Sequence, residues 1–169
     1  MLEIPSKITD RLEDYCKDHG VADDQIIGYG VDGFVWRTQQ NSVLKVHRHP
    51  REFERECAAY QRLKEHGIRR LRGFAIPTLL DYDRDLLVLE LSFVSPPFVL
   101  DFGAASVNRP VEGVDSESDE FRDNVRSRYL HHADEVLLVI DALRLDGIYL
   151  SDIHPGNIQP VQHPDDGNS

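Results

Sequence analysis

The sequence predicts an α+β domain, in which a five-stranded antiparallel sheet and one packed helix are followed by a smaller helical part. Two observations carry this prediction. Short segments rich in β-branched and aromatic residues, separated by glycine or polar turns, fill residues 25–47 and recur between residues 79 and 91. Segments with helical spacing of apolar residues lie between these strands and after them.

Composition narrows the class of protein. The 169 residues fit one domain that can bury its own core. A formal net charge of -11 disfavours nucleic acid and anionic membranes as partners, and no uncharged apolar run approaches membrane-spanning length. Cys16 and Cys57 are too few for a disulfide framework and lack metal-ligand spacing, which favours reduced thiols and a cytoplasmic location.

The first half of the chain yields one helix and a meander. Residues 7–19 are expected to form an amphipathic helix, because apolar residues recur at helical spacing until Gly20. This helix is expected to pack on the part of the chain that follows it. Turn residues then separate three expected strands, at residues 25–29, 34–39 and 42–47.

A second helix and a hairpin complete the expected sheet. Pro50 suits the first turn of a helix, which Gly67 ends, and one face of this helix is apolar. That face carries Phe53, Cys57, Tyr60 and Leu63 and is expected to pack on the sheet. Residues 79–82 and 86–91 are expected to pair around a polar turn.

The second half of the chain differs in composition from the first. The run SPP at residues 95–97 is a candidate hinge, and residues 106–118 are a candidate flexible connector. Residues 117–128 are a candidate charged helix, and residues 136–143 are apolar nearly all round, as in a buried helix. The expected single domain therefore comprises an N-terminal helix (1–24), a sheet lobe (25–92), a hinge and connector (93–118), a reduced helical lobe (119–158) and a frayed tail (159–169).

The run DIHPGN at residues 152–157 is the most informative chemical motif. It places Asp152 and Asn157 five residues apart on one tight loop. In phosphoryl transfer such an Asp can orient an attacking hydroxyl, and such an Asn can hold Mg²⁺. The same residue types also occur in ordinary surface turns, so the loop needs supporting signals elsewhere in the chain.

A glycine-rich stretch provides the first supporting signal. Gly28, Gly30 and Gly33 match a pattern that two unrelated classes of nucleotide site share. A dinucleotide-binding fold needs a helix to begin within the motif, whereas residues 34–38 are β-branched and aromatic. A strand–loop–strand that passes over phosphates is therefore favoured, and a glycine-rich hairpin without a ligand is the alternative.

Lys45 provides the second signal. Strand alternation places it on the opposite sheet face from Leu44 and Val46, and an inward-facing charge requires a partner. Glu56, on the flank of the packed helix, is the favoured partner. A solvated Lys45 stays open, as do the rival partners Glu52, Glu54 and Glu65.

In this order, the glycine stretch, strand lysine, helix glutamate and DIHPGN loop resemble the protein-kinase-like superfamily over about residues 25–158. The loop is closest to that of kinase-like phosphotransferases that act on small molecules. The run SPPFVLDFG at residues 95–103 also resembles small bacterial kinase-like proteins. The resemblance implies a protein-kinase-like fold, ATP and Mg²⁺ as cofactors, Asp152 as base, Asn157 as metal ligand, and a nucleotide site comprising Gly28, Gly30, Gly33, Val35, Lys45 and Glu56.

The chain also departs from that family. Leu150 stands where a His is usual, and Ser151 precedes the catalytic Asp. The family's second metal ligand is the Asp of an Asp-Phe-Gly motif beyond the Asn, and the sequence given ends at Ser169, about where that motif would begin. Asp101-Phe102-Gly103 spells the motif but precedes the loop, so it is expected to leave the cleft and not to bind Mg²⁺.

Three functions stay open at this point. The leading expectation is an ATP-binding phosphotransferase, acting on a protein or a small molecule, with an unknown acceptor. The loss of a metal ligand favours a degenerate kinase that serves as a nucleotide-responsive binding module, because catalysis in this class depends on charge neutralisation around Mg²⁺. A scaffold without nucleotide is the third reading.

Overall fold

The computed structural model describes residues 3–161, so residues 162–169 of the expected tail lie outside the described residues. The longer elements are α1 (Ser6–His19), β1 (Asp23–Tyr29), β2 (Gly33–Thr38), β3 (Ser42–His47), α2 (Pro50–Glu65), β6 (Leu79–Asp83), β7 (Val88–Ser92), α3 (Asp119–Tyr129) and α4 (Ala133–Leu145). The shorter ones are β4 (Arg70–Leu71), β5 (Phe74–Ala75), β8 (Phe98–Val99), β9 (Ser106–Val107), η1 (Leu130–His132), β10 (Ile148–Tyr149) and β11 (Ile158–Gln159).

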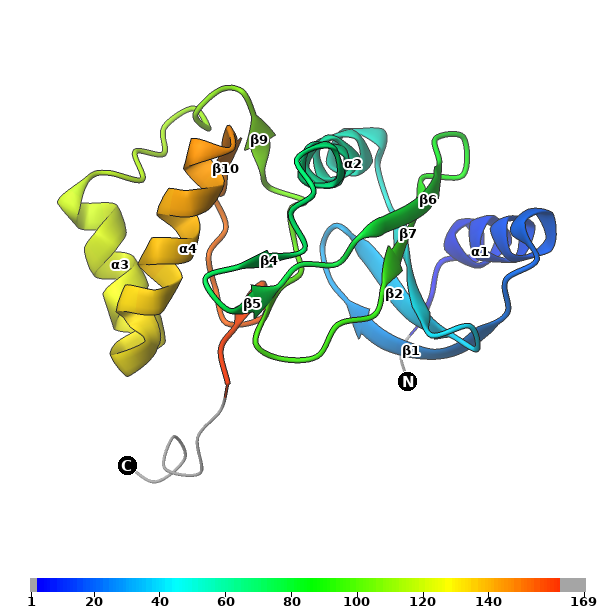
Figure 1. Cartoon of the computed structure of the whole chain (residues 1–169). Helices are drawn as coiled ribbons and strands as arrows, with labels where there is room; N and C mark the ends of the chain where they lie inside the picture. Colours follow the sequence, from blue (N-terminus) through cyan, green and yellow to red (C-terminus); the bar gives the residue numbers. More distant parts are fainter. Residues whose placement is uncertain (1–2, 162–169) are drawn as a thin grey trace.

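A five-stranded sheet in the order β1-β2-β3-β7-β6 dominates the first half (Figure 1). Every neighbouring pair in it is antiparallel, which confirms the predicted α+β class and sheet. The central strand β3 is buried at all of its positions. Gly33 pairs with His47 at the edge of this strand, and a Cβ at Gly33 would lie 2.2 Å from the backbone oxygen of Val46. Glycine at position 33 is therefore required by packing.

Helices cover both faces of this sheet. Alternation along β3 sends Leu44 and Val46 to one face and Val43 to the other. On the first face, the buried residues of α1 are Ile8, Leu12 and Tyr15. On the second face, the buried residues of α2 include Phe53, Cys57, Tyr60 and Leu63, as the sequence predicted. The packing partner of α1, which the sequence left open, is thus the far side of the sheet.

The helical part shares one core with the α2 side of the sheet. Val136, Val139, Ile140 and Leu143 of α4 are buried in the same cluster as Phe53 and its neighbours. Figure 1 shows α3 and α4 side by side, at the opposite end of the molecule from α1. No helix within residues 3–161 is long and apolar enough to cross a membrane.

Short strand pairings fix the loop that follows α4. β10 pairs with β9, and β11 pairs antiparallel with β8 in a small sheet of order β11-β8-β5-β4. Residues 151–157, here called the Asp152 loop, lie between β10 and β11. Both ends of the loop are therefore anchored to segments that precede α3 in the chain.

Candidate functional site

A cleft of about 580 Å³, here called the main cleft, brings together segments that are far apart in the sequence. It is lined by the β1–β2 turn, by the inward face of β3, by residues 98–101 and by the Asp152 loop. The predicted site residues that line it are Gly28, Gly30, Gly33, Val35, Lys45, Asp152 and Asn157. Glu56 lies behind Lys45.

Lys45 and Glu56 form a buried ion pair. Lys45 Nζ lies 2.7 Å from Glu56 Oε2, and the two residues are 7% and 0% exposed. The rival partner Glu54 instead pairs with Arg84 at the surface. Lys45 is inward-facing because alternation directs it toward α2, where Glu56 occupies the flank of the apolar face.

His47 is part of the same buried group, and sequence analysis missed it. Its Nε2 lies 2.7 Å from Glu56 Oε2, and its Nδ1 lies 3.2 Å from the backbone oxygen of Leu87. The two ring nitrogens of His47 thus contact a carboxylate on α2 and the backbone before β7, so the imidazole joins both segments to β3. The available signal was alternation, because His47 is two residues after Lys45 and shares its face of β3.

Asp101 lies in the main cleft, so the expectation that its segment leaves the cleft is wrong. Asp101 Oδ1 lies 3.0 Å from Lys45 Nζ. The cause is strand pairing: β8 pairs with β11, and the Leu100 amide donates to the backbone oxygen of Asn157 at 2.9 Å. This ladder places Asp101 beside the Asp152 loop, although its segment comes earlier in the chain.

The rest of the Asp-Phe-Gly run is anchored by packing. Phe102 is fully buried, and its ring meets that of Tyr60 edge-on at a centroid distance of 5.1 Å. Tyr60 also donates its hydroxyl hydrogen to the backbone oxygen of Leu100. Helix α2 therefore holds both partners of Lys45, Glu56 directly and Asp101 through Tyr60.

The charges of Lys45, Glu56 and Asp101 stabilise one another. Burial by itself would lower the pKa of Lys45, but the Glu56 and Asp101 carboxylates outweigh it and raise that pKa. Burial opposes ionisation of Asp101 as well, yet Lys45 and the Gly103 amide, 2.8 Å away, hold the pKa of Asp101 below its usual range. Both groups are therefore charged at neutral pH.

Asp32, at the turn between β1 and β2, is a second residue that sequence analysis missed. A Cβ at Gly103 would lie 2.8 Å from Asp32 Oδ2, so the glycine allows the turn to approach Asp101 closely. Burial, followed by the nearby Asp101 carboxylate, raises the pKa of Asp32. The cleft thus holds an acidic group at the place where the glycine turn meets the Asp152 loop.

Oxygen atoms suited to a hard cation meet in a small void of about 10 Å³, which is close to the lower limit for one water-sized occupant. Asp32, Asp101, Asp152 and Asn157 border it. Asn157 Nδ2 donates to the backbone oxygen of Asp152 at 2.9 Å, which leaves the amide oxygen as its ligating end. Within residues 3–161 no group of three or more His, Cys, Asp or Glu is placed to hold a metal ion by itself. The Asp101 carboxylate and the Asn157 amide oxygen are of the ligand type that Mg²⁺ takes at nucleotide sites, where phosphates and water provide the other ligands.

The main cleft also has an apolar lining. This lining is made of aliphatic and aromatic side chains from both sides of the cleft, namely Ile27, Val35, Val43, Leu91, Phe98 and Leu100. Apolar side chains together with a few charged and polar groups are the usual lining of a site for a small-molecule ligand or cofactor.

Comparisons with known proteins give only remote likenesses. No family model and no curated protein matches the sequence. The streptomycin–ATP complex of APH(2'')-IIa is 15% identical over 56% of this chain and 30% of that chain, with a TM-score of 0.41. Macrolide 2'-phosphotransferase MphH from Brachybacterium faecium is 19% identical over 85% of this chain and 48% of that chain, with a TM-score of 0.43.

A third similar structure is the ADP-bound aminoglycoside phosphotransferase APH(2'')-Ib, 16% identical over 51% of this chain and 28% of that chain, with a TM-score of 0.40. These structural neighbours belong to the protein-kinase-like superfamily. The chain spans less than half the length of each of them. At these identities and TM-scores the likeness is confined to part of the fold and does not extend to substrates.

Glu56→Gln should lower the free energy of unfolding by about 3–5 kcal/mol, because it removes the charge that faces Lys45 in the buried group. Urea titration followed by circular dichroism measures this loss. The matched control is Glu54→Gln, which breaks an exposed pair with Arg84 and should cost less than about 1 kcal/mol. Equal losses in the two variants would contradict the role assigned to Glu56.

Asp32→Asn should stabilise the protein at pH 7. Because the folded pKa of Asp32 is raised, its ionised form destabilises the fold above that pKa, and this cost disappears below the unfolded value. Removal of the Asp32 charge should therefore raise the free energy of unfolding at pH 7 by at most about 1 kcal/mol. Thermal unfolding should show the gain shrinking toward pH 4. The exposed control Asp24→Asn should change the free energy of unfolding at pH 7 by less than about 0.5 kcal/mol.

Proposed function

We propose that this protein binds ATP with Mg²⁺ and transfers the γ-phosphoryl group to a hydroxyl acceptor. The observation that supports it best is Lys45, held between Glu56 and Asp101 at 2.7 and 3.0 Å in a cleft that Asp152 and Asn157 also line. A fixed ammonium beside hard oxygen ligands and a glycine turn is the arrangement that a nucleotide triphosphate requires.

The apolar and the charged lining residues of the main cleft serve different parts of the nucleotide. The purine packs against apolar lining residues such as Val35 and Leu91. Gly28 and Gly30 let the turn between β1 and β2 pass over the phosphates, and a Cβ at Gly30 would meet no described atom within 4 Å. Lys45 contacts the phosphate oxygens from the side opposite this turn.

Asp101 and Asn157 provide the protein's ligands to Mg²⁺. Asp101 Oδ1 is already engaged by Lys45 and the Gly103 amide, so its second carboxylate oxygen is the ligating one. Bound Mg²⁺ would neutralise the charge of the phosphates during transfer. Two protein ligands with the remainder from phosphate and water is the usual environment of Mg²⁺ at nucleotide sites.

Asp152 is the base. Its side chain is exposed at the mouth of the main cleft, and Asn157 fixes its backbone at 2.9 Å. In the transfer step the acceptor oxygen bonds to the γ-phosphorus, the bond from that phosphorus to the β–γ bridging oxygen breaks, ADP leaves, and the hydroxyl proton passes to Asp152.

Leu150 and Ser151, the two residues before Asp152 that differ from the superfamily pattern, have structural roles of their own. Leu150, in the place of the usual His, is 5% exposed and belongs to the core. Ser151 donates its hydroxyl hydrogen to the backbone oxygen of Ala104 at 2.7 Å. Apolar packing and this hydrogen bond therefore hold the loop in place of a polar His contact.

A nucleotide-binding module without transfer activity is the second candidate. Asp32 favours it, because a third carboxylate beside Asp101 and Asp152 repels the phosphates of ATP unless a cation compensates. Binding without turnover would identify this function.

ATP with Mg²⁺ should stabilise the protein against heat. At a hundredfold excess over Kd the gain is about 2.7 kcal/mol, or roughly 5–10 °C in Tm for a domain of this size. Lys45→Met should remove most of this shift, measured relative to the variant's own Tm without nucleotide. Lys17→Met, on the exposed side of α1, is the control and should keep it. No shift with any purine nucleotide would overturn the proposal and support a scaffold instead.

Asp152 and Asp101 should differ in what they control. Asp152→Asn should keep the thermal shift but lower ADP formation by about 10²- to 10⁴-fold, because only the proton acceptor is lost. Asp101→Asn should instead reduce the dependence of the shift on Mg²⁺. If Asp101→Asn leaves the Mg²⁺ dependence intact, the metal assignment is wrong.

A further inference from the structure

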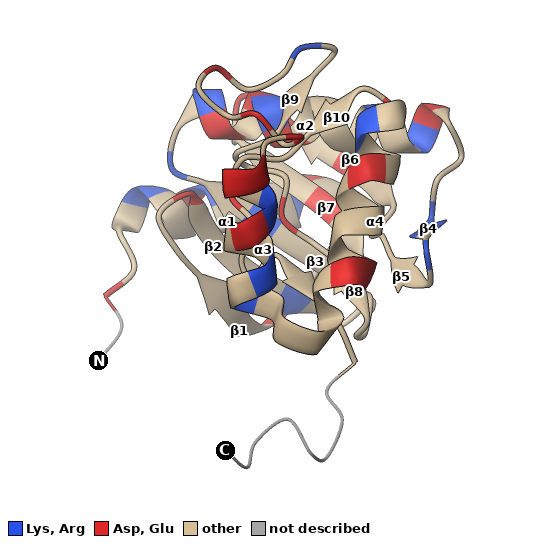
Figure 2. Ribbon diagram, turned by 90° about the vertical axis from the view of Figure 1, so that its left-hand side faces the viewer, with Lys and Arg blue, Asp and Glu red and all other residues tan. Residues whose placement is uncertain are grey.

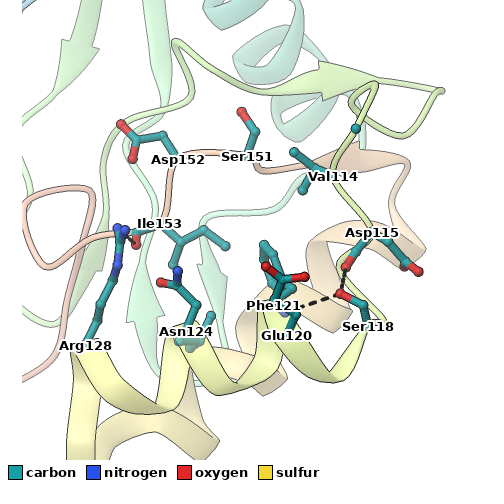
Figure 3. A pocket seen from close by; sticks show the side chains of 12 residues that line it. Val114, Asp115, Ser118, Glu120, Phe121, Asn124, Arg128, Ser151, Asp152 and Ile153 are labelled. Carbon is teal, nitrogen blue, oxygen red and sulfur yellow. Dashed lines mark hydrogen bonds between the residues drawn. The ribbon is translucent and has the colours of Figure 1, made fainter.

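A groove beside α4 takes no part in the proposed transfer. Figure 3 shows a cavity between α3 and the Asp152 loop, which Asp152 lines, so this cavity belongs to the site already described. The groove, here called the α4 groove, has a volume of about 380 Å³ and shares no lining residue with that cavity or with the main cleft. Its walls come from the β4–β5 hairpin, from Pro97 before β8, from α4 and from Val161 after β11.

Exposed apolar side chains line the α4 groove. Leu138 of α4 is 49% exposed and Val161 is 45% exposed, whereas Phe74 of β5 is buried. The same outward face of α4 carries Leu145, which is two helical turns further along and is also exposed. Adjacent apolar side chains left in contact with water are characteristic of surfaces that bind a partner.

Arginine residues gather on the β4–β5 hairpin, which forms one edge of the α4 groove. Arg69, Arg70 and Arg72 are exposed, and none of the three forms an ion pair with another residue in the range 3–161. Arg72 lines the groove itself, and Figure 2 shows β4 in blue at the right-hand edge of the molecule. Three guanidinium groups are thus available to a molecule that occupies the groove.

Backbone pairing holds this hairpin in place. Strand β5 pairs with β8, and the Ala75 amide donates to the backbone oxygen of Pro97 at 2.8 Å. The hairpin turn places Arg72 at φ 52° and Gly73 at φ 91°, both in the left-handed region. Asn, Asp or Gly is preferred at the first of these positions, so the backbone of Arg72 is strained, and strain of this kind clusters at binding sites.

The charge around the α4 groove is opposite to that of the chain. Glu135 is the one carboxylate that lines the groove among the described residues, and its Oε2 lies 3.8 Å from Nδ1 of His132 on the same side of α4. The three hairpin arginines outnumber it, whereas the whole chain has a net charge of -11. A local positive potential on an acidic protein attracts carboxylates to this surface in particular.

We propose that the α4 groove and the β4–β5 hairpin dock an acidic peptide segment of a partner protein. An apolar side chain of that segment enters the groove, and its carboxylates pair with Arg69, Arg70 and Arg72. Guanidinium groups bind carboxylates through paired hydrogen bonds, and clusters of arginine are a recurring means of binding acidic motifs. This docking does not depend on the proposed function, because the groove shares no lining residue with the main cleft.

Fluorescence anisotropy with a labelled peptide tests the charge requirement. The probe carries a Phe-Leu pair between two runs of glutamate, and its matched counterpart has glutamine in place of every glutamate. The acidic peptide should bind about tenfold more tightly at low salt, and added salt should reduce this difference. Arg72→Glu should weaken binding of the acidic peptide about tenfold, whereas Lys7→Glu, the same charge change on the exposed side of α1, should alter it less than about twofold.

Two further variants separate docking from folding. Arg72→Gly relieves the positive φ, so it should keep or raise Tm while it weakens binding of the acidic peptide about fivefold. Leu138→Ala, at a half-exposed position, should weaken binding of both peptides and leave the thermal shift with ATP and Mg²⁺ unchanged.

Equal binding of the two peptides, or equal effects of Arg72→Glu and Lys7→Glu, would overturn this inference. Self-association of the chain in sedimentation, abolished by Leu138→Ala and not accompanied by peptide binding, would also overturn it and identify a second copy as the occupant of the groove. Charge-selective peptide binding without any ATP shift would overturn the proposed function alone and leave the docking surface in place.

Discussion

The burial of one lysine charge in the central strand constrains the whole structure. An ammonium removed from water costs several kcal/mol unless charges and hydrogen bonds compensate it. Lys45 receives that compensation from Glu56 on α2 and from Asp101 after β8. Each partner belongs to a different element, so the pairing of one cation fixes a helix and a short strand against the sheet at once.

His47 extends this constraint to the far side of Glu56. The carboxylate oxygen that binds Lys45 also lies 2.7 Å from His47 Nε2, and both Glu56 and His47 are fully buried. A carboxylate held from two sides cannot change rotamer without leaving a buried group unpaired. The position of Lys45 in the main cleft therefore depends on contacts that lie outside the cleft.

Asp101 lies beside the Asp152 loop although the two are far apart in the sequence. Strand β8 and Asp101 precede α3, α4 and the Asp152 loop in the chain. Antiparallel pairing requires adjacent strands and matched hydrogen bonds, and it does not depend on which strand comes first in the chain. The β8–β11 pair thus brings Asp101 next to the Asp152 loop, and α3 and α4 lie between the two strands in the chain.

Local patterns in the sequence determined the sheet, the helices and the side on which Lys45 lies, because periodicity states which face of an element a side chain occupies. The same reasoning favoured Glu56 over its rivals and a strand after the glycine turn. Only the tertiary structure decided the packing of α1, the partners of His47 and the place of Asp101. These depend on β3 meeting Leu87 and on β8 meeting β11, and periodicity reports the direction of a side chain but not the distant segment that it meets.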